Sequence, residues 1–372
     1  MHRSVSRHRH KRQHDSVTTA IAPSSTTRLA GLDLARALAL IGMLMVHIGP
    51  TDGETLAGTL YALPQGRASI LFMLVAGVGV SLMAARGRGA TDLRLLWRAL
   101  LLLPLGLALQ LPAHAPMIIL PTYAVLFVLT TALIRLSTPV LLYATVVAAL
   151  AGPAGFLLGY LQSPEVFANA PMTFRDTPGS ILHGIVLSGP HPVITWLFPF
   201  LAGMLLGRLD LRDRMVQFLL VFVGAIAALI LTGIGLVTRV LLGEEFSHAG
   251  WHWLLRTDAH SQMLLWLGSA TATAAAVLGA SLWLAERAGA WLRPLTDTGR
   301  IALSFYVGHI LALVCWPDTL RSDHPAEAAG MALAVTAGTA LAAMIWLRLF
   351  GRGPLEILLQ PPRRRAPAAE SA

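Results

Sequence analysis

The stretch that decides the fold class covers residues 32–50 and reads LDLARALALIGMLMVHIGP. Between Arg36 and His47 it contains no charged residue. An apolar run of about 20 residues is as long as a helix must be to cross the hydrocarbon core of a bilayer. The run is too long for the apolar part of a signal peptide, and no cleavage site of small residues is recognisable. We therefore expect a retained membrane-spanning helix.

Composition extends this interpretation to the whole chain. Of the 372 residues, 55% are hydrophobic and 13% are charged, and the mean hydropathy is +0.65. Such a chain is too apolar for a soluble domain, whose surface must be wetted. We predict an all-α, polytopic membrane protein, a bundle of about ten transmembrane helices near residues 32–49, 66–85, 93–112, 116–135, 139–161, 191–208, 215–242, 261–286, 300–316 and 327–350.

The excess of basic residues indicates orientation and not a nucleic-acid partner. The net charge is +9, but the arginines gather in alternate connections, as the positive-inside rule requires of cytoplasmic loops. We therefore predict a multi-pass protein of the plasma membrane with both termini in the cytoplasm and no nucleic-acid partner. The outer side then holds only five arginines, which are Arg67, Arg175, Arg239, Arg256 and Arg321.

Three segments follow one another along the chain. Residues 1–28 are polar and basic, which is typical of a disordered cytosolic tail. Residues 29–360 form the predicted transmembrane domain, and residues 361–372 form a second cytosolic tail. The single cysteine, Cys315, excludes a disulfide within the chain, and no spacing of metal ligands is recognisable. The preference for arginine over lysine indicates a GC-rich bacterial genome.

The first predicted span carries ionisable residues at both ends. Eleven residues, or about three turns, separate Arg36 from His47, so both side chains lie on nearly the same helix face, about 16 Å apart along the axis. Asp33 precedes Arg36 by three residues, where an ion pair can form. One interpretation is structural, with charges that reach the headgroups at each helix end. The other is functional, with Arg36 binding phosphate and His47 acting as a general base or acyl carrier.

Further candidates lie in later segments. Arg67 stands at the outer start of the second span, against the positive-inside bias, so we expect an anionic ligand or partner there, with interfacial snorkelling as the alternative. His260 begins a later span from the same side. His309 lies about 13 Å beyond Arg300 along its helix, where a histidine must be hydrogen-bonded or line a cavity. Tyr306, three residues earlier, is a candidate partner for His309.

These residues belong to patterns that resemble known membrane acyltransferases. Arg36, ten intervening residues and His47 are similar to the Arg-x10-His signature of the acyltransferase-3 family. A longer similarity, over about residues 28–360, is to bacterial relatives of heparan-α-glucosaminide N-acetyltransferase and to YeiB-like membrane proteins. It rests on short segments in a common order: GRASILF at 66–72, LAGMLLGRLD at 201–210, His260-Ser261, LSFYVGH at 303–309 and GRGPLE at 351–356.

The resemblance implies an enzyme that moves an acyl group, chiefly acetyl, from cytosolic acetyl-CoA or another acyl-CoA to an extracytoplasmic acceptor. No permanently bound cofactor is implied, and a carbohydrate of the cell envelope is the expected acceptor. In the eukaryotic enzyme an asparagine matches His47 and the acetyl-accepting histidine lies in the next outer loop, whereas residues 50–66 contain no histidine. The catalytic candidates are therefore His47, His260 and His309, and the candidates for binding donor or acceptor are Asp33, Arg36, Arg67, Ser69 and Tyr306.

Two other functions stay open. A transporter or flippase for a small anionic or glycan-linked solute would explain the arginine and histidines within the membrane equally well. A catalytically silent family member that acts through a protein partner is the third function. The expected partners are the lipid bilayer, an acyl-CoA and a small-molecule or glycan acceptor, and a homo-oligomer is left open.

Overall fold

The computed structural model describes residues 28–51, 55–112 and 116–362, so the predicted N-terminal tail and most of the C-terminal tail lie outside the described residues. The longer helices are α1 (Ala30–Ile48), α3 (Arg67–Ala84), α4 (Arg88–Leu109), α5 (Leu120–Leu133), α6 (Thr138–Gln162), α8 (Val193–Leu206), α9 (Arg214–Leu242), α10 (Leu264–Ala288), α11 (Arg293–Arg300), α12 (Ala302–Cys315) and α14 (Pro325–Phe350). Shorter elements are α2 (Leu56–Tyr61), α7 (Pro178–His183), α13 (Pro317–Leu320) and the π or 3-10 turns Gly184–Ser188, Gly243–Ser247 and Trp251–Leu255.

The predicted fold class is confirmed, since the described residues form helices and no strand. Six helices are long and apolar enough to cross a membrane, and eight spans result if two bent helix pairs each count as one. All ten predicted spans coincide with helices. The difference between ten and eight spans arises from α4 and α5, which are not apolar enough or long enough to count. The first half of α4 carries charges and α5 has only 14 residues. The count of ten and the cytoplasmic position of the termini stay predictions.

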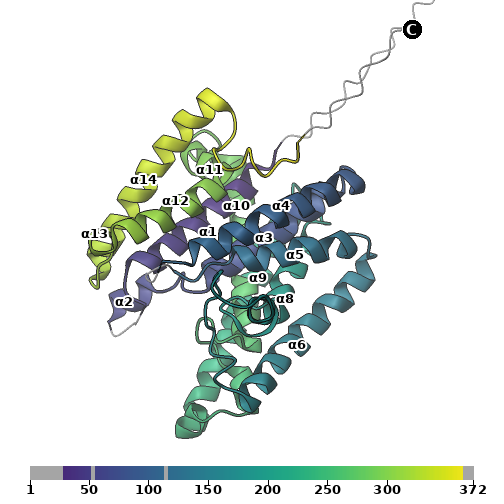
Figure 1. The fold of residues 1–372 in the computed structure, drawn as a ribbon, viewed down its shortest axis with the longest axis vertical. Coiled ribbons are helices and arrows are strands. Elements are labelled where there is room, and N and C mark those ends of the chain that lie inside the picture. Colours follow the sequence, from purple (N-terminus) through teal and green to yellow (C-terminus); the bar gives the residue numbers. More distant parts are fainter. Residues whose placement is uncertain (1–27, 52–54, 113–115, 363–372) are drawn as a thin grey trace, which may run out of the picture.

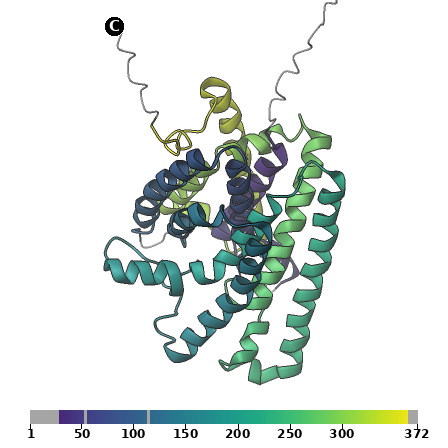
Figure 2. The same ribbon diagram turned by 90° about the vertical axis from the view of Figure 1, so that its right-hand side faces the viewer.

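Helix α1 lies in the interior of the bundle, between α3, α10, α11, α12 and α14 (Figure 1). In α1, 67% of the membrane-length window is buried, against 17% in α9, which packs beside α10 at the edge of the molecule (Figure 2). An outer helix covered with leucine, isoleucine, valine and phenylalanine fits the bilayer as its surroundings. The residues of α1 therefore face other helices, where polar groups can find partners.

A sharp bend brings α11 across the end of α1. Helices α11 and α12 meet at 83°, and Gly299 at the end of α11 lies against the backbone of Asp33. A Cβ atom on Gly299 would come within 1.8 Å of the Asp33 carbonyl oxygen. Only a glycine permits this approach, which places Asp297 and Arg300 of α11 beside the first turn of α1.

The chain after α14 folds back over the same end of the bundle. We call residues 351–362 the C-terminal strap. Its Glu356 accepts hydrogen bonds from the backbone nitrogens of Leu303 and Ser304, at 2.7 and 3.0 Å, and from the Ser304 hydroxyl at 2.7 Å. A carboxylate at this point satisfies the free N–H groups that every helix start leaves open. The strap is thereby attached to the first turn of α12.

Candidate functional site

A cavity of about 920 Å³ opens at the end of the bundle where α1 begins and the strap returns. We call it the arginine cavity. Its lining includes seven arginines and three carboxylates, so the positive charges exceed the negative charges by four. Such a cavity attracts and can bind a ligand with several phosphate groups. The lining arginines are Arg28, Arg36, Arg86, Arg98, Arg212, Arg300 and Arg352, and the acids are Asp33, Asp210 and Glu356.

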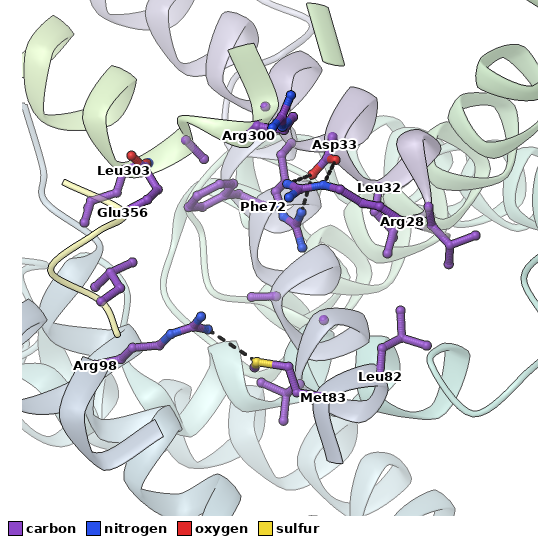
Figure 3. A pocket seen from close by; sticks show the side chains of 18 of the residues that line it. Arg28, Leu32, Asp33, Phe72, Leu82, Met83, Arg98, Arg300, Leu303 and Glu356 are labelled. Carbon is purple, nitrogen blue, oxygen red and sulfur yellow. Dashed lines mark hydrogen bonds and ion pairs between the residues drawn. The ribbon is translucent and has the colours of Figure 1, made fainter. Parts of the chain in front are cut away.

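Asp33 organises the arginines on α1. Its side chain is 2% exposed, and it forms ion pairs with Arg28 and Arg36. Arg28 donates from Nη2 to Oδ1 at 2.8 Å, and Arg36 donates from Nη1 to the same oxygen at 2.7 Å. The hydrogen bonds to Asp33 raise the pKa of Arg28. The predicted Asp33–Arg36 pair is therefore formed, and Asp33 holds two guanidinium groups at the cavity wall (Figure 3).

Arg98 enters the cavity from α4, on the side opposite Asp33. Its Nη1 lies 3.7 Å from the sulfur of Met83, and its Nε is buried with no hydrogen-bond partner among the described residues. Arg36 and Arg94 are close enough to interact with Arg98 electrostatically, and both repel it. A half-buried cation among like charges is costly unless an anion accompanies it. Arg98 thus indicates an anionic ligand.

The inner wall of the cavity becomes aromatic. Phe72, Tyr123, Phe127 and Tyr306 all line it. The Tyr306 hydroxyl accepts a hydrogen bond from the backbone nitrogen of Ile119 at 3.3 Å. This wall continues the cavity from its charged mouth toward the middle of the bundle, where only an apolar or weakly polar part of a ligand fits.

The histidine pair lies directly behind Tyr306. The rings of Tyr306 and His309 meet edge to face with centroids 5.4 Å apart. His47 Nδ1 lies 3.2 Å from His309 Nε2, and their rings are nearly parallel, at 9°. The side chain of His309 also contacts the Phe305 carbonyl oxygen through Nδ1 at 3.1 Å. His309 is therefore hydrogen-bonded as predicted, although its side-chain partner is His47, and Tyr306 contacts it through the ring.

These contacts determine where the protons of the neutral pair lie. A carbonyl oxygen only accepts, so the neutral His309 carries its proton on Nδ1 and presents a lone pair at Nε2. His47 must then donate from Nδ1. The lone pair of His47 is consequently on Nε2, the atom that faces away from His309. A histidine fixed in this tautomer can take a proton or attack a carbonyl with Nε2.

His260 belongs to a second aromatic cluster near His47. It lies before α10 with a φ of 58°, and its ring centroid is 5.6 Å from those of both His191 and Trp266. Burial lowers the pKa of His260 to about 4, so it is neutral at neutral pH. Its Nδ1, like Trp266 Nε1, is buried without a hydrogen-bond partner in the described part of the chain. A charge on His260 would be close enough to affect His47, so these two predicted residues lie in the same region of the bundle, although no hydrogen bond or ring contact between them is observed.

Arg67 and Ser69 lie at the start of α3, close to this cluster. Gly66 has a φ of 70° and packs against Trp266, where a Cβ would come within 2.8 Å of the indole ring. Arg67 is half-buried, and the described residues provide no ion pair or hydrogen bond for its side chain. Ser69 is half-buried on the same helix. The structure thus gives Arg67 surroundings suited to an anion and gives Ser69 no distinct contact.

The predicted site residues separate into two groups. Asp33, Arg36 and Tyr306 line the arginine cavity, whereas His47, His309 and His260 gather behind its aromatic wall. Sequence reasoning missed six of the seven cavity arginines, because each looked like an ordinary positive-inside residue, and it also missed Tyr123 and Glu356. The signal that could have found one of them is an arginine inside a predicted span, at position 98. The missed arginines are Arg28, Arg86, Arg98, Arg212, Arg300 and Arg352.

The fold and the site together define a multi-pass α-helical membrane protein with a polybasic cavity that leads to buried histidines. Within the described ranges, no three or more histidine, cysteine or acidic side chains gather as a metal site would require. The arrangement offers phosphate binding at one end and proton transfer or nucleophilic attack by an imidazole at the other.

The family follows from comparison with family models. The model described as "Heparan-alpha-glucosaminide N-acetyltransferase, catalytic" matches residues 28–238, which is more than half of the chain. The chain belongs to this family, and the resemblance to relatives of heparan-α-glucosaminide N-acetyltransferase is confirmed, whereas the Arg-x10-His signature stays a prediction. A second model, described as "Protein of unknown function (DUF418)", matches residues 195–361. No curated protein matches the chain. The protein is therefore a membrane protein of an acetyltransferase-like family.

Proposed function

We propose that this protein is an acyltransferase that takes an acetyl group from cytosolic acetyl-CoA and passes it to an acceptor at the other side of the membrane. One observation carries the proposal. The arginine cavity ends at Tyr306, and the ring of Tyr306 packs on His309, which is hydrogen-bonded to His47. A phosphate-binding entrance and a candidate base thus lie on the two sides of one aromatic wall.

The donor would bind with its phosphates among the guanidinium groups of the cavity. Arg36 and Arg300 each have one Nη group paired with a carboxylate, which orients the remaining N–H groups. None of the described carboxylates that line the cavity forms an ion pair with Arg98. Guanidinium groups bind phosphate oxygens in a planar, two-pronged geometry. The acyl arm would extend along Phe72 and Tyr306 toward the histidines.

The transfer itself needs a base beside the thioester carbonyl. His47 Nε2 would accept the proton of the acceptor hydroxyl or amine while its oxygen or nitrogen attacks that carbonyl. The carbon–sulfur bond then breaks, and the leaving thiolate takes the proton from His47. Alternatively, Nε2 attacks the thioester carbonyl and the thiolate leaves. The acyl-imidazole then passes the acyl group to the acceptor, whose proton goes to the thiolate as the imidazole is regenerated. Arg67 and His260 would orient the acceptor, and a carbohydrate acceptor rests on family analogy alone.

The test uses purified protein in proteoliposomes, with acetyl-CoA labelled in the acetyl group on the side of the arginine cavity. We expect His47→Ala to lower turnover by about 100-fold or more, because a general base contributes that much. Arg36→Gln should raise KM for acetyl-CoA by roughly tenfold, because a charged hydrogen bond to phosphate is lost. The matched control is His324→Ala, a solvent-exposed histidine before α14.

Full turnover by His47→Ala would exclude His47 as the base or acyl carrier. Intact acetyl-CoA together with movement of another solute across the vesicle would instead establish a transporter. Acetyl label that stays on the wild-type protein after rapid denaturation at neutral pH, is released by hydroxylamine, and is absent from His47→Ala would distinguish an acyl carrier from a base.

A further inference from the structure

A second cavity, of about 590 Å³, lies next to the arginine cavity. Its walls are the first half of α4 and the C-terminal strap. Arg98 and Arg352 line both cavities, whereas Arg94 lines the second cavity alone. The other lining residues are Met83, Ala90, Leu93, Leu359, Gln360, Pro361 and Pro362.

The charge of this second cavity is unbalanced. It contains three arginines and no carboxylate among its described lining residues. Arg94 precedes Arg98 by one helical turn, a spacing at which like charges repel, and the two are close enough to interact. The buried Nε of Arg98 is unpaired within the described chain, and Arg352 donates only to the amide oxygen of Gln360, at 2.6 Å. The cavity therefore has donors and positive charge ready for an anion.

The surroundings of the cavity are apolar on its outer side. Leu93, Leu96 and Leu100 of α4 are 56%, 47% and 66% exposed. They form an apolar surface that continues from the cavity wall, where Leu93 itself takes part. Trp97, on the same helix, donates to the Leu358 carbonyl of the strap at 2.7 Å. Tryptophan and arginine beside an exposed leucine face are typical of the boundary between headgroups and acyl chains.

We propose that the second cavity binds a phosphate ester, and specifically the headgroup of an anionic phospholipid, through Arg94, Arg98 and Arg352. The phosphate would lie between the guanidinium groups, and the acyl chains would follow the leucines of α4. Arg98 and Arg352 are shared with the arginine cavity, whereas Arg94 lines the second cavity alone, so a test on Arg94 separates lipid binding from donor binding. A soluble phosphate ester has the same phosphate chemistry, but it has no acyl chains that could contact the exposed leucines of α4.

The experiment measures lipid binding directly. Protein in phosphatidylcholine nanodiscs is titrated with labelled phosphatidylglycerol, and with labelled phosphatidylcholine of the same acyl chains so that chain contacts cancel. We expect the wild type to prefer phosphatidylglycerol and Arg94→Gln to lose about tenfold of that preference. The control variants are Arg86→Gln, which alters only the arginine cavity, and Arg287→Gln, which alters an arginine stacked on Trp283 away from both cavities. Both should keep the preference.

Three results would overturn the proposal. One is an equal affinity of the wild type for both lipids. Another is an equal loss of preference in all three variants, which would indicate surface charge in general. A third is displacement of the labelled lipid by inorganic phosphate or adenosine 3′,5′-bisphosphate, if binding of that soluble ligand also depends on Arg94. The ligand of the cavity would then be a soluble phosphate and not a lipid. Matching gel-filtration profiles and thermal midpoints establish that each variant is folded. Because lipid binding is read without turnover, an inactive enzyme does not affect the result.

Discussion

The hydrogen bonds of His309 decide which nitrogen of His47 is available for chemistry. The Phe305 carbonyl accepts from His309, and His309 in turn accepts from His47. When His47 takes a proton on Nε2, its Nδ1–H becomes a stronger donor, and His309 stabilises the resulting cation. In the proposed reaction His309 would therefore be a positioning residue that acts through His47.

We predict that His309→Gln and His309→Leu differ in their effect. Glutamine keeps an amide oxygen that can accept from His47 Nδ1, so kcat should fall about tenfold, whereas leucine removes the acceptor and should cost about 100-fold. KM for acetyl-CoA should change little in either, because His309 lies behind the cavity wall. Steady-state kinetics of both variants provide the measurement, and equal losses of kcat would contradict this role.

Individual site residues were only partly predictable. The positions of Arg36 and His47 follow from helical spacing within one segment, and the structure forms the expected Asp33 pair. The contact between His47 and His309 joins residues 262 apart in sequence, so periodicity cannot reveal it. Arg98 was overlooked because a basic residue in the first turns of a predicted span, here 93–112, satisfies the positive-inside rule whether or not it lines a cavity.

At the scale of elements, the site depends on how closely α11 approaches α1. The contact between Gly299 and the Asp33 carbonyl leaves no room for a side chain. It brings Arg300 to the arginine cavity, where its Nη1 pairs with Asp297 at 2.8 Å. Because of the 83° bend, α11 runs beside the cavity, whereas α12, which carries His309, runs into the bundle.

We predict that Gly299→Ala destabilises the protein by about 1–3 kcal/mol, because the added methyl group must displace α11 from α1. The thermal midpoint in detergent should fall, and donor affinity should weaken with it. Gly338→Ala in α14 is the matched control, since nothing lies within 4 Å of its added Cβ. A midpoint for Gly299→Ala equal to that of the control would show that α11 can move freely.

The helices themselves were more predictable than their geometry. Apolar length sufficed to locate helices at all ten predicted spans, because each must satisfy its backbone polar groups within the membrane. The bend between α11 and α12 depends on packing against α1, which a hydropathy profile does not contain. For the same reason the short α5 and the charged start of α4 leave the number of true spans between six and ten.

At the scale of the whole molecule, the bundle has two chemically different ends. The arginine cavity occupies one end, and the loops that lead to His260 and Arg67 belong to the half that contains the histidines. The orientation follows if the arginine-rich end faces the cytoplasm. Any even number of spans keeps both termini on one side, so this prediction survives the difference between eight and ten.

Cysteine accessibility tests this orientation. In a Cys315→Ser background, Ala290→Cys lies in the exposed turn between α10 and α11, and Asp323→Cys lies in the exposed connection before α14. We expect a membrane-impermeant maleimide added to intact cells to label Asp323→Cys, while Ala290→Cys should react only after permeabilisation. The reverse pattern would invert the proposed direction of acyl transfer.

The arginine cavity also bears on how the protein is made. It is walled by Arg28 and Arg36 from the beginning of the described chain and by Arg352 and Glu356 from its end. A nascent polypeptide still on the ribosome, with α1 inserted but the strap not yet synthesised, lacks one side of this cavity. Synthesis from the first helix to the last therefore completes the arginine cavity only at its final stage. Under the proposed function, prematurely terminated chains would not compete for cellular acetyl-CoA.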